Sequence, residues 1–361
     1  MKTVPGLSLG AVMMASGVLS ACGVAASRPA SSASGPPALQ TLYEAAKKEG
    51  EVIWVANEIK AAADDIDKAF TARYPGVKAT FNPANEPQIP AQVITEATNG
   101  ARVVKSIDVG HGSPTQFLPL YERDLLLSPD WASFGVDPSR SRIGGKWLVN
   151  EDNVDVWIYN TDTVAPADVP TQWQDLLKAR WKGKKIVTNA SAAGLSQLFM
   201  TMGEDKAHDF LTALKGQDLL VTKSRGPARE MVANGQAQLT VTGVKDLVDL
   251  KRQGAQVDGI PALGPMARDE RGWYLPKQTQ HPNAAQLFIA WIVTPEGWKL
   301  QQQAGLDIAV PCGASDVAKY VCDSGLQYMD VNSSGLDLFA YYSKLNHYQD
   351  LAREVLQLKP E

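Results

Sequence analysis

The alternation of short apolar strands with helical segments constrains the fold of this chain more than any other feature. Residues 51–56 (EVIWVA) and 77–81 predict strands, because short apolar runs there are bounded by turn residues. Apolar residues recur at helical spacing in 61–74 and 88–98, which predicts helices. The same alternation returns between residues 172 and 253. Such a pattern is typical of α/β domains with a largely parallel sheet.

Two α/β units joined by extended segments predict two lobes with a cleft between them. We expect lobe 1 to comprise residues 38–145, with 265–310 returning to it, and lobe 2 to comprise 150–260. Residues 311–361 predict a C-terminal helical segment. Ligands of such sheets bind beyond the carboxyl ends of the strands, and domain junctions are preferred pocket sites. The expected fold is therefore α/β and two-lobed, with the ligand between the lobes.

Composition and motifs exclude several classes of function. The chain has 361 residues, of which 35 are Lys or Arg and 39 are Asp or Glu, so its formal charge is −4. This mild acidity argues against a nucleic-acid partner, because phosphate-binding proteins carry a basic excess. The sequence has no GxSxG, HExxH, SxxK, Walker or GxGxxG motif, and its four histidines are far apart. We therefore expect neither enzymatic activity nor a cofactor.

The N-terminus has the layout of an export signal. A basic start at Met1-Lys2 precedes an apolar, small-residue run, which is typical of a secretory signal in residues 1–22. The run ends Leu19-Ser20-Ala21-Cys22, which resembles the bacterial lipobox and implies lipid attachment at Cys22. The alternative is ordinary cleavage after Ala26. Residues 23–37 have the Ser, Pro and Gly content of a flexible tether, so we expect a periplasmic or cell-surface protein held at a membrane.

Two further cysteines, Cys312 and Cys322, lie close together in the sequence. An exported protein meets an oxidising compartment, which favours a structural disulfide between them. The alternative is a metal-binding pair, but it lacks a nearby His or further Cys.

Four segments together resemble a known family. They are LYEAAKKEGEV at 42–52, VWIYNTD at 156–162, WQDLLKARWKGKK at 173–185, and HPNAAQLFIAW followed by TPEG within 281–297. In this order they resemble bacterial extracellular solute-binding proteins of the ferric-binding-like type, over about residues 39–310. The resemblance implies a type II periplasmic-binding-protein fold whose lobes close around a small molecule and deliver it to the permease of an ABC importer. We expect a monomer, since no sustained heptad is present.

The family's iron-binding residues have no equivalents here. The resemblance places its His, its Glu and its adjacent tyrosines at about Ile59, Ser113 and Val244-Lys245, and none of these is a suitable ligand for Fe(III). The only adjacent tyrosines, Tyr341-Tyr342, lie in the C-terminal segment and are typical of helix packing. We therefore expect no bound metal ion, while a preformed ferric chelate stays an alternative.

The second lobe offers a site for an anion. The resemblance implies an anion cradle in the small-residue loop 189–194, around Ser191 and Ala192, because backbone N–H groups at a helix start favour anions. The alternative is an ordinary helix cap. The resemblance also places Arg225 in the cleft, and Lys245 can add a second positive charge; both are equally consistent with solvated surface positions.

The first lobe supplies candidates where its strands end: Asn57, Glu58, His111, Gly112 and Ser113. Trp273 can form an aromatic wall, although core packing is the commoner fate of tryptophan. The sequence thus predicts a binding protein for a small organic anion, such as a phosphonate, sugar phosphate or carboxylate. A ferric-chelate binder and a two-lobed exported enzyme are the alternatives.

Overall fold

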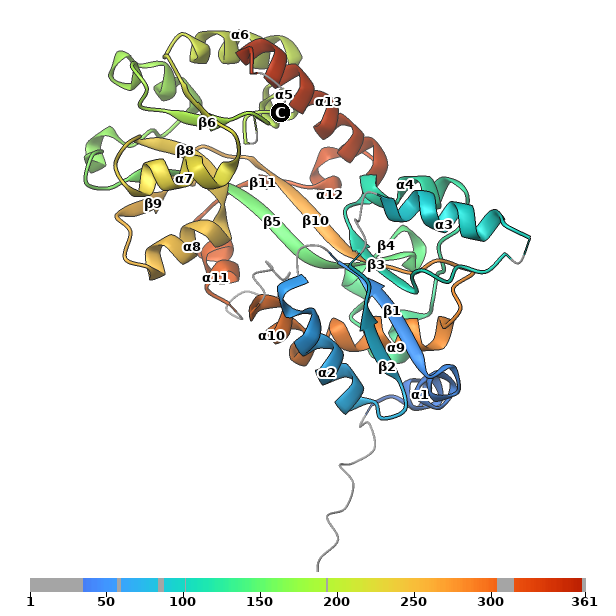
Figure 1. The fold of residues 1–361 in the computed structure, drawn as a ribbon. Helices are drawn as coiled ribbons and strands as arrows, with labels where there is room; N and C mark the ends of the chain where they lie inside the picture. The colour runs from blue at the N-terminus through green and yellow to red at the C-terminus, as the bar shows by residue number, and fades with distance from the viewer. Residues whose placement is uncertain are drawn as a thin grey trace, which may run out of the picture. The chain divides into compact units, whose positions relative to one another are not determined.

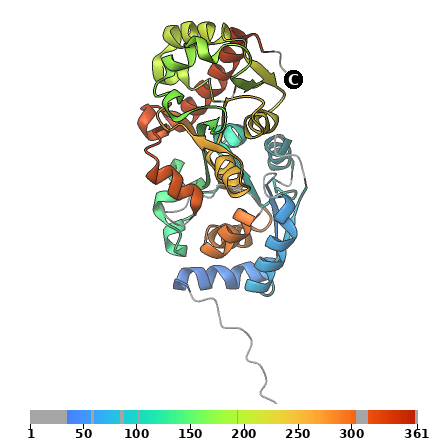
Figure 2. The ribbon, with the colours of Figure 1, turned by 90° about the vertical axis from the view of Figure 1, so that its left-hand side faces the viewer.

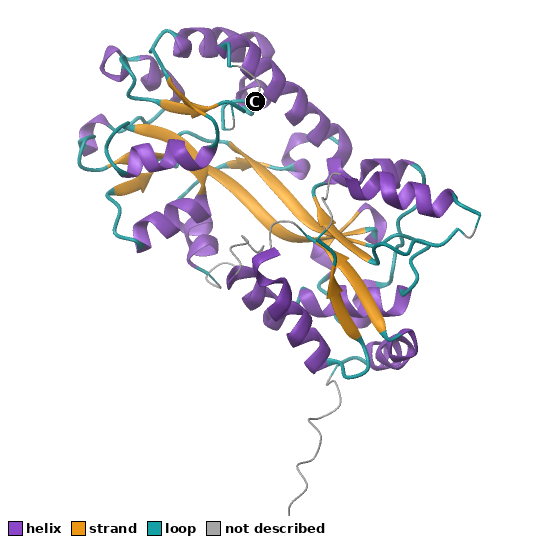
Figure 3. Ribbon diagram, in the orientation of Figure 1, coloured by secondary structure: helices purple, strands orange, loops and turns teal. Residues whose placement is uncertain are grey.

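One long strand, β5 (Trp147–Asn160), runs through both lobes and organises the fold (Figure 1). Its first half pairs antiparallel with β10 (Met266–Tyr274) and with β4 (Ser141–Arg142). Its second half pairs antiparallel with β8 (Leu239–Gly243) and β9 (Val257–Gly259). Figure 3 shows these strands between two groups of helices. The lobes are therefore joined by a shared sheet.

The computed structural model describes residues 35–56, 60–83, 88–100, 102–192, 194–303 and 315–358. Among the described helices, none combines the length and apolar character that a bilayer span requires. The predicted signal segment, Cys22 and all but the last residues of the tether lie outside these ranges, as do Asn57, Glu58 and Cys312.

The first lobe is built on parallel strands, as its apolar runs predict. β1 (Glu51–Val55) lies between β2 (Lys78–Phe81) and β3 (Val109–Gly112), and β10 continues the sheet antiparallel to β3. Aromatic rings fill the space between sheet and helices, with Trp54 stacked on Phe288 at 5.4 Å between ring centroids. The helices of this lobe are α1 (Pro37–Glu49), α2 (Ala63–Arg73), α3 (Ile89–Thr98), α4 (Pro114–Glu122), α9 (Pro282–Ile292) and α10 (Pro295–Gln303).

The second lobe repeats the alternation with shorter elements. β6 (Val187–Asn189) pairs parallel with β7 (Leu220–Thr222), and a bridge from Ile186 to Leu239 joins this pair to β8. Its helices are α5 (Leu198–Met202), α6 (Glu204–Lys215), α7 (Arg225–Ala233) and α8 (Val244–Arg252). Figures 1 and 2 show α5 and α6 at one end of the described body and α1 and α2 at the other.

The C-terminal segment connects the two lobes. After α11 (Asp316–Asp323), β11 (Tyr328–Met329) and α12 (Val331–Ser334), the chain forms α13 (Leu338–Leu356). The start of α13 buries Leu338, Tyr341 and Tyr342 in the apolar cluster of the first lobe, against α4. Its end buries other apolar residues in the cluster of the second lobe, against α5 and α6. One helix therefore packs in both cores.

The adjacent tyrosines pack against β10, as the sequence indicates. The Tyr342 hydroxyl accepts a hydrogen bond from the Glu270 N–H at 2.7 Å and donates to the Glu270 carbonyl at 3.0 Å. The Tyr341 hydroxyl donates to the Met329 carbonyl at 2.7 Å. These hydroxyls satisfy backbone groups of β10 and of β11, the strand that pairs with it.

Two expectations about organisation remain predictions. Residues from Gly35 onward form one compact unit, so the proposed boundaries between the lobes are not tested by how the chain divides. The second expectation is the disulfide of Cys322, which lies on α11. Its expected partner, Cys312, lies outside the described residues.

Candidate functional site

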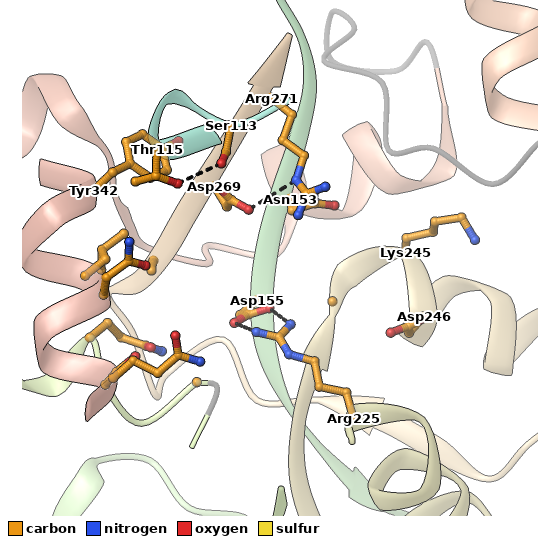
Figure 4. A pocket seen from close by; sticks show the side chains of 18 residues that line it. Ser113, Thr115, Asn153, Asp155, Arg225, Lys245, Asp246, Asp269, Arg271 and Tyr342 are labelled. Carbon is orange, nitrogen blue, oxygen red and sulfur yellow. Dashed lines mark hydrogen bonds and ion pairs between the residues drawn. The ribbon is translucent and has the colours of Figure 1, made fainter. Parts of the chain in front are cut away.

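A cavity of about 570 Å³ lies where the crossing strands meet the starts of α7 and α8 and the middle of α13 (Figure 4). Both lobes and their connections line it. The first lobe contributes Ser113 and Thr115; the crossing strands contribute Asn153, Asp155, Ala267, Asp269 and Arg271; the second lobe contributes Gly194, Ser196, Gln197, Arg225, Gly243, Lys245 and Asp246; and α13 contributes Tyr342, Leu345, Asn346 and Gln349. Most of these residues are polar or charged.

The crossing strands form one wall of the cavity. Asn153 and Asp155 alternate along β5, and Asp269 and Arg271 alternate along β10, so each pair projects from one face of its strand. Asn153 lies directly opposite Asp269 in the antiparallel register. The four polar side chains therefore share the face that lines the cavity, as Figure 4 shows.

Arg225 enters the cavity from the first residue of α7. Its guanidinium forms a two-pronged ion pair with Asp155, in which Nη2 lies 2.8 Å from Oδ2. Burial disfavours the charged guanidinium, but the carboxylates of Asp155, Asp246 and Asp269 outweigh burial and raise the pKa of Arg225. Arg225 is therefore charged and surrounded by three acidic groups.

The other cations of the lining also have carboxylate partners. Lys245 pairs with Asp249 one turn along α8, at 2.5 Å. Arg271 Nε lies 3.5 Å from Asp269 Oδ2, and burial lowers the pKa of this arginine. Asp246 pairs with Arg229 and accepts a hydrogen bond from the Thr242 hydroxyl at 2.7 Å. The cavity lining thus holds three acidic and three basic side chains.

The small-residue loop of the second lobe is held by a turn at Asn189 and by a contact from α13. The Asn189 side chain accepts a hydrogen bond from the Ser191 N–H at 3.0 Å. The Gln349 side chain on α13 donates to the Ser191 carbonyl at 3.0 Å. Ala192 is buried, and neither Ser191 nor Ala192 lines the cavity. These contacts hold the loop in place, and an anion cradle at Ser191 and Ala192 stays a prediction.

The residues of this loop that do reach the cavity come later in the sequence. They are Gly194, Ser196 and Gln197, which precede the five-residue helix α5. Gly194 has φ +81°, and a Cβ there would lie 2.2 Å from Val241 Cγ1. Glycine is therefore required at this position by its backbone conformation and by close packing against β8.

The candidates from the first lobe differ according to whether they lie within β3 or after it. Because this strand continues to Gly112, His111 pairs within the sheet opposite Trp273, with 4.7 Å between their rings. His111, Gly112 and Trp273 are buried and are not among the residues that line the cavity. Burial lowers the pKa of His111 to about 3. Ser113, the first residue after the strand, does line the cavity.

Of the residues proposed from the sequence, Ser113, Arg225 and Lys245 line the cavity, and most of its other lining residues were not proposed. Asp155, Asp269, Arg271, Asn346 and Gln349 are among the lining residues that the sequence did not suggest. A signal for the strand residues exists: the stretches NEDNVDVWIYN and MARDERGWY each place several charged residues beside an apolar run. Charged residues inside strands that join two lobes indicate a wall in contact with water. In the described part of the chain, no three His, Cys, Asp or Glu side chains are grouped to hold a metal ion.

Comparison with known sequences gives a consistent set of relatives. The sequence profile of the bacterial extracellular solute-binding proteins matches residues 65–319. The Fe(3+)-binding periplasmic protein of Serratia marcescens is 24% identical over 310 residues, covering 81% of this chain and 88% of that protein. An uncharacterized protein of Haemophilus influenzae is 28% identical over 154 residues, or 40% of this chain; the matched region spans 44% of that relative's length.

Comparison with solved structures shows the two-lobed fold. Iron-bound HitA from Pseudomonas aeruginosa has a TM-score of 0.62 at 19% identity, over 84% of this chain and 99% of that chain. AfuA from Actinobacillus pleuropneumoniae, with fructose-6-phosphate bound, has a TM-score of 0.55 at 18% identity, over 85% of this chain and 97% of that chain. The Atu4243-GABA receptor has a TM-score of 0.63 at 14% identity, over 84% of this chain and 97% of that chain. At these identities the likeness concerns the fold alone.

Proposed function

Because this chain belongs to the bacterial extracellular solute-binding protein family, we propose that it captures a small organic anion in the cavity between its lobes. The family is exported and supplies ligands to ABC importers, so the bound solute is handed to a permease. Lobe closure around the ligand fits this role, since closure is driven by contacts that the ligand makes only in the closed state.

The observation that carries the proposal is the position of Arg225. Its guanidinium projects into the cavity from the start of α7, and Lys245 and Arg271 line the same space. A guanidinium offers two parallel donors that match a carboxylate, a phosphonate or a phosphate. Ser113 and Thr115 add hydroxyl groups from the first lobe. Asn57 and Glu58, outside the described residues, stay candidates for the same lobe.

Thermal shift measurements test the proposal. We expect one anion class among phosphonates, sugar phosphates and carboxylates to raise the melting temperature by several degrees, since a ligand at one hundred times its Kd adds about 2.7 kcal/mol. Arg225→Ala should weaken binding by about 1.5–3 kcal/mol through loss of a charged hydrogen bond. The matched control is Arg252→Ala, because Arg252 pairs with Asp316 away from the cavity. Equal affinity in the wild type and in Arg225→Ala would remove Arg225 from the site.

A ferric chelate is the second candidate solute. The iron-binding name of the Serratia relative favours it, and so do the carboxylates that line the cavity. Ferric citrate belongs in the same thermal panel, and a shift with this chelate alone would replace the organic anion. Recovery of any bound solute chemically unchanged after incubation would separate a binding protein from a two-lobed enzyme.

We further propose that Cys22 carries a lipid and that a tether links it to the folded body. The observation behind this is the lipobox-like sequence before Cys22 in an exported protein. Labelled palmitate should be incorporated into the wild type and absent from Cys22→Ala. A mature N-terminus beginning after Ala26 would instead indicate ordinary cleavage.

A further inference from the structure

We propose that the solute carries a cationic group as well as an anionic one, so that the cavity binds a zwitterion of the amino acid or aminophosphonate type. The inference rests on the proposed function, because it assumes that this cavity is where the solute binds. It goes further by naming the second charge of the ligand and the side chains that receive it.

The first argument is the charge balance of the cavity. Arg225, Lys245 and Arg271 face it, but so do Asp155 and Asp269, and Asp246 adds a third carboxylate. An anion that pairs with these cations leaves the acidic groups of the lining without their partners. The acidic groups here repel an anion that approaches Arg225, because all three lie close enough to raise the pKa of that guanidinium.

The second argument is the two-pronged pair between Arg225 and Asp155. Both Asp155 oxygens are bound to the two terminal nitrogens of Arg225, and the Asp155 residue is only 8% exposed. A ligand anion that takes these nitrogens leaves the Asp155 carboxylate without its partner. Uncompensated buried charge is strongly unfavourable. A ligand ammonium placed against Asp155 restores the balance, so one zwitterion replaces both halves of the pair.

The third argument is the position of Asp269. It lies directly opposite Asn153 across the two strands, and Asp155 is two residues further along β5. Diagonal neighbours of this kind stand roughly 7–8 Å apart. An ammonium has three donors and fits between two carboxylates at this spacing. The Asn153 side chain, a neighbour of both on the same face, supplies a further acceptor.

Matched probes test the second charge. We would titrate 2-aminoethylphosphonate, ethylphosphonate and ethylamine into the purified protein by calorimetry, and then 4-aminobutyrate, butyrate and butylamine. The zwitterion of a series should bind at least about tenfold more tightly than its matched anion and its matched amine. Equal binding of the zwitterion and the anion would overturn the inference and leave the proposed function intact.

The variant Asp155→Asn should change the affinities for the zwitterion and for the anion in different directions. It should weaken zwitterion binding by about tenfold or more, and it should leave anion binding unchanged or stronger because Arg225 is released. Asp269→Asn is the second variant and should act in the same direction, in case Asp155→Asn folds poorly. Asp258→Asn is the matched control, since Asp258 pairs with Lys251 outside the cavity.

The outcomes separate the two proposals. Tighter binding of a zwitterion to Asp155→Asn and Asp269→Asn than to the wild type would contradict the inference. So would a sugar phosphate or simple carboxylate that binds through Arg225 while every zwitterion fails. If no probe of any class shows binding that depends on Arg225, the proposed function itself fails.

Discussion

Replacing Asp108 by alanine should destabilise the protein far more than removing an exposed aspartate, because one buried carboxylate holds three chain segments together. Asp108 is 1% exposed and lies just before β3. It accepts hydrogen bonds from the Ile53 N–H at 2.7 Å, from the Thr279 hydroxyl, and from the His281 N–H at 3.2 Å. The His281 ring nitrogen Nδ1 lies 2.9 Å from Asp108 Oδ2. These contacts join β1, the approach to β3, and the connection from β10 to α9.

The magnitude follows from the donors that lose their acceptor. Asp108→Ala leaves two backbone N–H groups and a hydroxyl buried without their partner, and each such group costs about 1–3 kcal/mol. Some of these donors will rotate or recruit water, so the sum is an upper bound. Breaking a buried, hydrogen-bonded charge typically costs about 3–5 kcal/mol. We expect a loss in this range, which is a large share of the ~5–15 kcal/mol that stabilises a typical protein.

Urea unfolding followed by tryptophan fluorescence measures this loss. The midpoint should fall by about 1 M or more. Asp350→Ala is the matched control, because Asp350 pairs with Arg353 but its side chain is 69% exposed. Exposed ion pairs contribute little, so the midpoint of the control should not move measurably. Equal midpoints for Asp108→Ala and the control would refute the claim that Asp108 holds the first lobe together.

Three further predictions concern single positions. Burial lowers the pKa of His111 to about 3, against about 6.5 in the unfolded chain. The free energy of unfolding should therefore carry no penalty from His111 above pH 6.5. Between pH 6.5 and pH 3 it should fall by up to about 1.4 kcal/mol per pH unit, because the unfolded chain binds a proton there. Urea unfolding of His111→Gln at several pH values should lack this component, and an unchanged pH slope would contradict the assignment. Gly194→Ala should lower stability by about 2 kcal/mol or more, whereas Gly183→Ala, also at positive φ but with open space around it, should cost only its backbone strain. Similar urea midpoints for the two glycine variants would show that the contact with Val241 is unimportant. A non-reducing digest should link Cys312 to Cys322, and Cys312→Ser should lose ~3 kcal/mol in the chain-entropy model. Two free thiols would contradict this pairing.

The sequence predicts the first lobe well because its signals are local. Apolar runs bounded by turn residues become β1 and β2, and apolar residues at helical spacing become α2 and α3, each within two residues of the expected bounds. The second lobe is harder to predict, since its elements are short. Within the alternation expected between residues 172 and 253, Trp173–Leu177 is a 3-10 helix, and α5 is only five residues long.

The site is predicted where it follows a local rule and missed where it depends on long-range packing. Ser113 follows the end of β3 and Arg225 begins α7, and both line the cavity. The local rule that ligands bind beyond the carboxyl ends of strands suggests such positions from the sequence. His111 does not line the cavity, because β3 extends past it and pairs it with Trp273. The position of Gln349 depends on α13 crossing between lobes, and no local pattern in the sequence shows that path.

A crystal structure with bound solute would test the central claim most directly. We would use the solute that gives the largest Arg225-dependent thermal shift. The account predicts that this solute lies in the cavity beside β5 and β10, with its anionic group within hydrogen-bonding distance of the Arg225 guanidinium. A solute bound elsewhere on the protein, or bound in the cavity with Arg225 still paired to Asp155 and untouched by the ligand, would contradict it.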